Sequence, residues 1–362
     1  MSFKEFDLSD YITAFVVACI AATYKRHRFS TFTQGLRELL QWLLDNNCKD
    51  VCMESTGKYW IPIYNVLEND CTIVLAHPKY VKAIRGKKTD KKDAKWIADL
   101  FKHDLVAGSF MPPADIRQLR DLMRYRYKLT CFMSSEKNRL QNCLTVSNIQ
   151  LASVVTDTFG KSSQKILDKI LENPLDTSFD VEPLIHGSLK KKLPELELAI
   201  DGHITTEQAG KLQIIKKHFE DLESRKAELE ELILALASPY QQELDLILTA
   251  PSFTNVFTAI GIISEIGVNM EAFPSAKHLC SWAGLTPTNN ESAGKKKSVR
   301  VSKAGCYIKP LLVQCANAVV KSTKHPEIRN RYLRLRKRRG HKKAIIAIAR
   351  MLLTALYNML KK

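Results

Sequence analysis

The sequence predicts an α/β domain at its amino-terminal end, followed by two regions that are almost entirely helical. Three observations support this prediction. Short β-rich runs alternate with helical periodicity before residue 100, long amphipathic helical stretches follow, and after Pro239 short helical segments are separated by Gly and Pro. The three parts are expected at residues 1–150, 151–240 and 241–362, and a chain of 362 residues is long enough for each to bury its own core.

The amino-terminal part shows strands and helices in a definite order. Three strands come first, within residues 3–31, and three consecutive strands favour an antiparallel meander. Apolar runs and leucine spacing then predict a helix, a strand, a second helix, a strand and further helices. From the second strand onward the segments are expected over 12–17, 26–30, 31–46, 50–54, 60–68 and 72–76, and then through Val81 and Lys91. This order predicts a mixed sheet flanked by helices, which is the order of an RNase H-like domain.

Two long helices are predicted after the sheet. Pro112 and Pro113 break the chain before a basic helix that holds several arginines. The second helix carries apolar residues in a 3-4 alternation that only Lys226 interrupts: Leu212, Ile215, Phe219, Leu222, Leu229, Ile233 and Leu236. Such a heptad seam predicts a coiled-coil insertion or a dimer contact, and packing against the chain's own core is the alternative.

The carboxyl-terminal part is expected to be all α apart from one loop. A helix is predicted to begin at 273–275 and to end at Gly284. Residues 287–302 then form a polar loop with three consecutive lysines. Three further helices are expected over 307–321, 326–339 and 342–360.

The positive charge is concentrated in this last part. The chain carries a formal net charge of +17, and residues 290–362 alone hold 20 Lys and Arg against Glu291 and Glu327, so the rest is close to neutral. A basic end on a neutral body is typical of proteins that bind a polyanion. Nucleic acid is favoured over an acidic membrane surface.

The cysteines and the apolar runs indicate a cytoplasmic protein without a membrane partner. The nine cysteines are an odd number and include no CxxC pair, which is typical of reduced thiols and gives no zinc-ligand spacing. Residues 11–22 are apolar but lack the basic start of a secretory signal. Arg350 and Asn358 interrupt the apolar stretch 344–360, which is therefore expected to be a buried helix.

Two aspartates one helical turn apart lie in a stretch that otherwise carries only positive charge. Asp90 and Asp93 at i and i+3 project from one face of a helix, so both carboxylates can reach one hard cation. Nearby lysines, among them Lys87 and Lys88, can hold phosphates. The alternative is a solvated helix with internal ion pairs.

Two further carboxylates fit the same sheet. Glu54 ends the strand 50–54, at a sheet edge where ligands gather, and Asp7 on the first strand would lie beside it. With Asp90 and Asp93 they make four carboxylates that can hold two Mg²⁺ ions, since hard cations prefer oxygen ligands. Like charges this close repel one another unless cations neutralise them.

The polar loop places one small hydroxyl among hydrogen-bond donors and cations. Ser292 is a poor nucleophile until a base or a metal stabilises its alkoxide. Cations that follow it can hold the phosphate that it attacks: Lys295, Lys296, Lys297 and Arg300. A Ser/Thr turn in a solvated loop is the alternative. The basic helix adds three arginines that need a polyanion or solvent: Arg117, Arg120 and Arg124.

Four motifs follow one another along nearly the whole chain. They are VCMESTGKYW at 51–60, GKKTDKKDAKW at 86–96, LRDLMRYR at 119–126, and WAGLTP at 282–287 followed by SAGK at 292–295. In this order they resemble the bridge-RNA-guided insertion-sequence transposases that have an Asp-Glu-Asp-Asp catalytic domain.

The resemblance implies an amino-terminal domain similar to a Holliday-junction resolvase, a coiled-coil insertion and a carboxyl-terminal transposase domain. Metal-binding positions fall on Asp7, Glu54, Asp90 and Asp93. Ser292 takes the position of the nucleophile, which forms a transient phosphoserine link to DNA. The resemblance also implies a dimer to tetramer, in which the two parts of one active site come from different subunits. A structured noncoding guide RNA pairs with both target and donor DNA, so that base pairing chooses the sequence.

The start of the chain departs from the family's pattern. Residues 1–6 are short and charged where members have a hydrophobic strand leading into the first aspartate, and 19–22 lack the Asp and Gly of the usual turn. Asp10 is therefore an alternative to Asp7. Two other functions stay open: a junction-resolving nuclease whose acids activate water, and a non-catalytic nucleic-acid binder descended from a transposase.

Overall fold

The computed structural model describes residues 15–55, 57–81, 89–174, 178–287, 290–292, 295–298 and 300–362, with the backbone alone at 79–80, 290–292 and 295–298. The chain divides into two compact units, Met1–Met111 and Pro112–Lys362. This boundary differs from the one expected near residue 150. The long helix after Pro113 belongs to the second unit because it packs onto helices of that unit.

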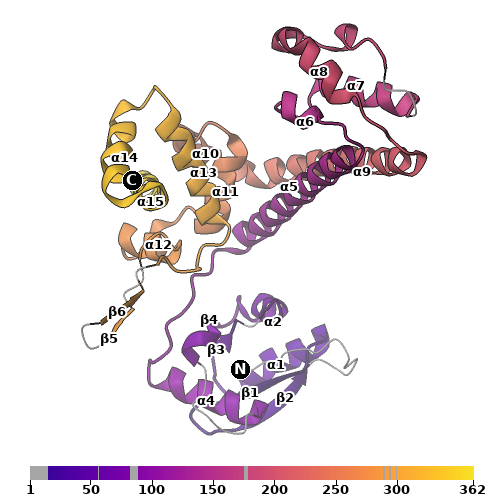
Figure 1. The fold of residues 1–362 in the computed structure, drawn as a ribbon. Coiled ribbons are helices and arrows are strands. Elements are labelled where there is room, and N and C mark those ends of the chain that lie inside the picture. Colours follow the sequence, from indigo (N-terminus) through magenta and orange to yellow (C-terminus); the bar gives the residue numbers. More distant parts are fainter. Residues whose placement is uncertain are drawn as a thin grey trace. The chain divides into compact units, whose positions relative to one another are not determined.

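The first unit is an α/β fold whose elements follow the predicted order (Figure 1). Its strands are β1 Phe15–Cys19, β2 Arg26–Ser30, β3 Asp50–Glu54 and β4 Thr72–Ala76. Its helices are α1 Thr33–Asp45, α2 Trp60–Leu67, α3 Pro78–Val81 and α4 Asp90–Lys102. β1 and β2 pair antiparallel, while β3 and β4 pair parallel. The predicted mixture of helices and strands in this part of the chain is confirmed.

The two strand pairs form separate sheets within the described residues, whereas the sequence predicts one mixed sheet. The first predicted strand, which would carry Asp7, lies outside the described residues. That strand was expected beside β3, where it would help to join the pairs. The RNase H-like arrangement therefore stays a prediction.

Side-chain alternation along β3 separates two apolar clusters. Val51 and Met53 join the cluster formed with α1 and α2, while Cys52 joins Ile97 of α4 in the other. A strand covered on both faces appears in the sequence as a continuous apolar run, which residues 51–53 show. Packing on both faces fixes the end of β3, where Glu54 lies.

Two long helices organise the second unit (Figure 1). α5 Ala114–Val146 and α9 Thr206–Ala237 run antiparallel, with Cys143 bonded to Gln208 and Arg126 bonded to Glu230. All apolar seam residues predicted on α9 are buried except Leu236, which is half-buried. Because α5 is the main contact of α9, the seam packs within the chain. A supercoil and a dimer contact stay predictions.

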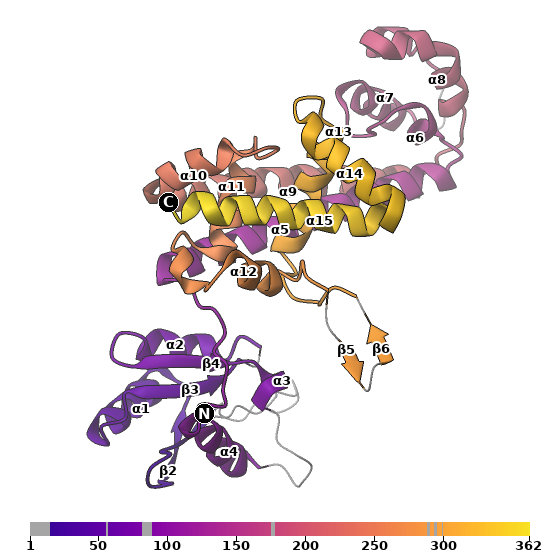
Figure 2. The ribbon, with the colours of Figure 1, turned by 90° about the vertical axis from the view of Figure 1, so that its left-hand side faces the viewer.

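The remaining helices lie at the two ends of this pair. Short helices α6 Leu151–Val154, α7 Lys161–Glu172 and α8 Leu193–Ile200 surround an apolar cluster at one end. A bundle occupies the other end and contains α10 Gln241–Leu248, α11 Val256–Ile266, α12 Ala276–Trp282, α13 Ile308–Lys321, α14 Pro326–Arg339 and α15 His341–Leu360 (Figure 2). Single 3₁₀ turns occur at Glu182–Leu184, Gly187–Lys192, Ser238–Tyr240 and Met270–Ala272.

α15 is the one helix in the described part of the chain that is long and apolar enough to cross a membrane. It contacts α10, α12, α13 and α14 in the bundle. Ile348, Leu352 and Leu356 are among its buried residues. The prediction of a buried helix here is confirmed.

A β-hairpin connects α12 and α13 where the sequence predicts a polar loop. β5 Asn290–Ser292 pairs antiparallel with β6 Lys295–Ser298. The sequence predicts an all-α carboxyl-terminal part apart from this loop, and the loop contains two short strands. Its strands are rich in Lys, Ser and Asn and lack the alternation of apolar and polar residues that marks a half-buried strand.

Candidate functional site

Glu54 is the last residue of β3 and lies opposite Ala76 in the parallel pair. The next residue, Ser55, donates its backbone N–H and its hydroxyl to the Ala76 carbonyl, at 2.8 and 3.0 Å. These bonds fix the chain where it leaves the strand. Ligands in α/β folds bind at the carboxyl ends of parallel strands, so the half-buried Glu54 occupies the position that the sequence predicts.

Asp90 and Asp93 both lie in the first turn of α4. Thr89 is the N-cap, and its hydroxyl accepts a hydrogen bond from the Lys92 N–H at 3.4 Å. Both aspartates are half-buried, whereas Lys91 and Lys92 between them are exposed. Both predicted ligands thus lie in the first turn of one helix, and their role as ligands stays a prediction. Negative charge at a helix N-terminus also stabilises the helix, which gives the pair a structural role.

The packing of α4 brings this pair to the core that holds β3. α4 contacts both β1 and β3 and buries Ala94, Ile97 and Ala98. Among the described residues, however, no group of three or more His, Cys, Asp or Glu side chains is placed to hold a metal ion. Asp7 and its alternative Asp10 lie outside the described residues. The donors that are described are carboxylate oxygens, the ligand type that Mg²⁺ prefers, and the four-carboxylate site stays a prediction.

Ser292 is the last residue of β5 and lies opposite Lys295, the first residue of β6. Glu291 lies opposite Lys296, and the register shifts between Asn290 and Glu291. The predicted nucleophile and the predicted phosphate-binding lysines, Lys295, Lys296 and Lys297, therefore belong to the two strands of one hairpin. Their side chains lie outside the described part of the structure.

α12 ends in a Schellman motif that directs the chain toward this hairpin. The Gly284 N–H donates to the Ser281 carbonyl at 3.0 Å, and the Leu285 N–H donates to the Cys280 carbonyl at 2.9 Å. Gly284 has a φ of 67°, which the left-handed position of the motif requires. The WAGLTP motif is thus a helix stop with a fixed exit.

Further contacts fix the base of the hairpin. Pro287 and Val301 form an antiparallel bridge between the two arms of the segment. The Lys309 ammonium group donates to the Ser302 carbonyl at 2.6 Å, and burial lowers the pKa of Lys309. Contacts at both ends of the segment that carries Ser292 therefore fix its position.

Arg120 and Arg124 on α5 bind the end of α11. Arg120 donates to the carbonyls of Ser264 and Glu265, at 2.9 and 2.8 Å, and so satisfies groups that a helix end leaves unpaired. Burial lowers the pKa of Arg120 to about 10. Arg124 makes two hydrogen bonds to the Glu265 carboxylate, at 2.8 and 2.9 Å. These contacts give both arginines a structural role, and nucleic-acid binding by them stays a prediction.

The other predicted nucleic-acid ligands are placed as follows. Arg117 donates to the Pro112 carbonyl at 3.0 Å at the start of α5. Arg300 is exposed beyond the end of β6. Lys87 and Lys88 lie outside the described residues.

α14 carries basic residues that the predicted site does not include. Ile328 and Tyr332 are its buried side, and seven basic residues are exposed on its other faces: Arg329, Arg331, Arg334, Arg336, Lys337, Arg338 and Arg339. None of the seven forms an ion pair with an acid in the described part of the chain. The sequence signal was the basic run itself, since Glu327 is the only acid in the helix. Such a surface suits a phosphate backbone.

Two family profiles match the chain. DEDD_Tnp_IS110, described as a transposase, matches residues 9–149, and the profile of the transposase IS116/IS110/IS902 family matches residues 245–333. The chain carries the transposase domains of the IS110 family. It is accordingly a DNA recombination enzyme whose substrate is DNA. No curated protein matches the chain.

The two IS110-family matches contain most of the candidate residues. The first begins at residue 9, so it includes Asp10 together with Glu54 and the two aspartates of α4, but not Asp7. The second includes Ser292 and the first half of α14. The residues between the matches, 150–244, form α6 to α9 and the start of α10, and so make a helical insertion between the two transposase domains.

Proposed function

We propose that this transposase is an RNA-guided recombinase of an insertion sequence, which cuts and exchanges DNA strands through a phosphoserine intermediate on Ser292. The observation that carries the proposal is the placement of Ser292 beside Lys295 in a hairpin with a fixed base. A serine is the residue type that attacks a phosphodiester, and a lysine is one that binds its charge. The match of a transposase domain to this segment supports the assignment.

The serine reaction conserves the number of phosphoester bonds. The Ser292 hydroxyl loses its proton and its oxygen attacks phosphorus. The bond from phosphorus to one sugar oxygen breaks, and that oxygen gains a proton and leaves as a hydroxyl. A hydroxyl of the partner DNA end then attacks the phosphoserine and releases Ser292. No nucleotide cofactor is needed for this exchange, and the sequence has no GxxxxGK[ST] loop.

Two Mg²⁺ ions are proposed at Glu54, Asp90, Asp93 and a fourth acid, either Asp7 or Asp10. When bound, such ions stabilise negative charge on the phosphate and lower the pKa of an attacking oxygen. The half-buried pair on α4 and the strand-end position of Glu54 support this donor set. The first profile match includes Asp10, Glu54, Asp90 and Asp93.

A guide RNA, an oligomer and a cytoplasmic location complete the proposal. The guide RNA would pair with donor and target DNA, while α14 contacts phosphates without regard to sequence. In a dimer to tetramer, Ser292 of one subunit would act with the acids of another. Reduced cysteines fit this location, because every cysteine among the described residues is a free thiol.

The testing experiment compares Ser292→Ala and Glu54→Gln in a strand-exchange assay with Mg²⁺, guide RNA and both DNA partners. Both variants are expected to lose exchange and to keep DNA binding. Normal exchange by Ser292→Ala would refute the serine mechanism. Hydrolysis that survives Ser292→Ala and stops without Mg²⁺ would identify a junction nuclease instead. Salt-sensitive binding without cleavage by the unaltered protein would identify a non-catalytic binder.

A further inference from the structure

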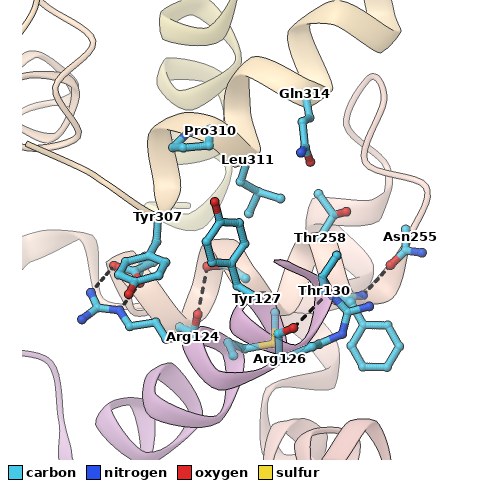
Figure 3. A pocket seen from close by; sticks show the side chains of 15 residues that line it. Arg124, Arg126, Tyr127, Thr130, Asn255, Thr258, Tyr307, Pro310, Leu311 and Gln314 are labelled. Carbon is cyan, nitrogen blue, oxygen red and sulfur yellow. Dashed lines mark hydrogen bonds and ion pairs between the residues drawn. The ribbon is translucent and has the colours of Figure 1, made fainter. Parts of the chain in front are cut away.

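A cavity of about 310 Å³ lies within the second unit, where α5, α11 and α13 meet. Figure 3 shows Arg124 and Tyr307 at one end and a group of polar side chains at the other. Tyr127 lies between them and points toward α13. The side chain of Tyr127 is 45% exposed, so the cavity is open to a ligand. Its volume is at the small end of the range for ligand pockets, about 300–1,000 Å³.

Arginines hold the aromatic walls in place. The Arg126 guanidinium lies 4.3 Å from the centroid of the Phe257 ring, and that of Arg124 lies 4.5 Å from the centroid of Tyr307. The rings of Tyr127 and Tyr307 meet edge to face, with centroids 5.7 Å apart. Walls fixed in this way lose little freedom when a planar ligand binds between them.

The arginines that line the cavity already bind carboxylates of the protein. Arg124 is bonded to both oxygens of Glu265, and Arg126 donates to Glu230 at 2.7 Å. An anion entering the cavity would have to compete with these carboxylates. A neutral, planar ligand gains the aromatic contacts without breaking an ion pair. The cavity therefore differs in chemistry from the exposed arginines of α14.

The polar end of the cavity offers hydrogen-bonding groups. The Asn255 side-chain oxygen accepts from the Phe257 N–H at 2.8 Å, which leaves its NH₂ group to donate. The side chains of Thr258 and Gln314 line the same end and make no hydrogen bond to another described residue. A primary amide presents a donor and an acceptor side by side, as the edge of a nucleobase does.

We infer that this cavity binds a single unpaired nucleobase of the nucleic acid on which the recombinase acts. The inference rests on the proposed function. It adds a site that binds a base by stacking and not by ionic contacts to phosphate. Stacking on aromatic side chains is the usual way for proteins to hold single-stranded bases, and the polar end would bond the base edge. Tyr127 is the stacking residue, and Gln314 and Asn255 are the edge-binding residues.

The test uses the full chain and two single-stranded DNA oligonucleotides, one with all its bases and one with a central abasic stretch. Tyr127→Ala is expected to weaken binding of the first about 5- to 100-fold without changing the salt dependence. Binding of the abasic oligonucleotide should stay the same. Tyr125→Ala is the matched control, because Tyr125 lies on the same helix, is 54% exposed and does not line the cavity.

Gly261→Ala provides a second variant that removes no contact group. A Cβ at residue 261 would lie 2.9 Å from a terminal carbon of Leu311, a lining residue, so that side chain must shift and the cavity changes shape. The same selective loss is expected, with thermal unfolding as the check on folding. Equal losses of affinity for both oligonucleotides, or equal losses for Tyr125→Ala and Tyr127→Ala, would overturn base binding by the cavity. The proposed function would still stand. Failure of the unaltered protein to bind any nucleic acid would overturn the proposed function as well.

Discussion

Gly284 and Gly305 pack backbone against backbone beside the base of the β5–β6 hairpin. A Cβ on Gly284 would lie 2.4 Å from the Ala304 carbonyl oxygen, and a Cβ on Gly305 would lie 2.3 Å from the Ala283 carbonyl oxygen. Both glycines have positive φ, 67° and 65°, a conformation that side chains disfavour. The two loops that flank the hairpin can therefore meet only if both positions lack a side chain.

We expect Gly284→Ala and Gly305→Ala each to lower the free energy of unfolding by about 1–3 kcal/mol or more, because strain adds to the backbone clash. Strand exchange should fall with it, since the base of the Ser292 hairpin moves. Gly210→Ala is the control: its Cβ would meet nothing within 4 Å in α9, and it should raise stability by up to about 1 kcal/mol. Thermal unfolding and exchange assays measure both effects. Unchanged unfolding of both hairpin-base variants would contradict this account.

Glu265→Ala is expected to lower the free energy of unfolding by about 3 kcal/mol, because it removes the acid that pairs with Arg124 while Arg120 stays buried. Urea unfolding measures this loss. Glu228→Ala breaks an exposed ion pair, in which the Arg225 side chain is 70% exposed and the Glu228 side chain 58%. It should lower the free energy of unfolding by no more than about 0.5 kcal/mol. If Arg124→Ala weakened nucleic-acid binding without lowering stability, the internal pair would not be the main role of Arg124.

A triple variant of α14, with Arg331, Arg334 and Arg338 replaced by Ala, should weaken DNA and RNA binding regardless of sequence. The slope of log affinity against log salt should fall by about one for each phosphate that the helix no longer binds. Stability should change little, since all three side chains are exposed. Lys190→Ala with Lys191→Ala removes exposed charge elsewhere in the same unit and should leave the slope nearly intact. If the slope of log affinity against log salt were the same for both variants, α14 would not be part of the nucleic-acid interface.

Asp10→Asn should abolish Mg²⁺-dependent cleavage at every Mg²⁺ concentration, and so should Asp90→Asn and Asp93→Asn. Asp7→Asn should keep cleavage, since one further acid beside Glu54, Asp90 and Asp93 completes the set of four. DNA binding should persist in all four variants, since the substitutions remove no positive charge. The opposite result for Asp7 and Asp10 would restore Asp7 as the first ligand. Cleavage in the presence of EDTA would contradict metal use altogether.

Short apolar strands and long periodic helices could be predicted closely from the sequence. β3 and β4 have the predicted bounds, because a β-rich run between polar residues has few alternatives. α14 also has its predicted bounds, set by Pro326 and Gly340. The hairpin that carries Ser292 was missed because its strands are polar throughout.

Partners far apart in the sequence could not be predicted. The charge of Arg124 is visible in the sequence, but Glu265 lies 141 residues away, and nothing local indicates that the two pair. Likewise the seam of α9 predicts an apolar partner but does not distinguish α5 from a second copy of the chain. The half-buried Asp90 and Asp93, by contrast, follow directly from their i, i+3 spacing.

The covalent link between protein and DNA tests the central claim most directly. The reaction is stopped with denaturant in mid-course, the protein is digested, and mass spectrometry locates the residue that carries a nucleotide phosphate. The account predicts an adduct on Ser292 that disappears in Ser292→Ala and persists in Ser298→Ala, a serine on the partner strand. Strand exchange without any adduct, or an adduct on another residue, would contradict it.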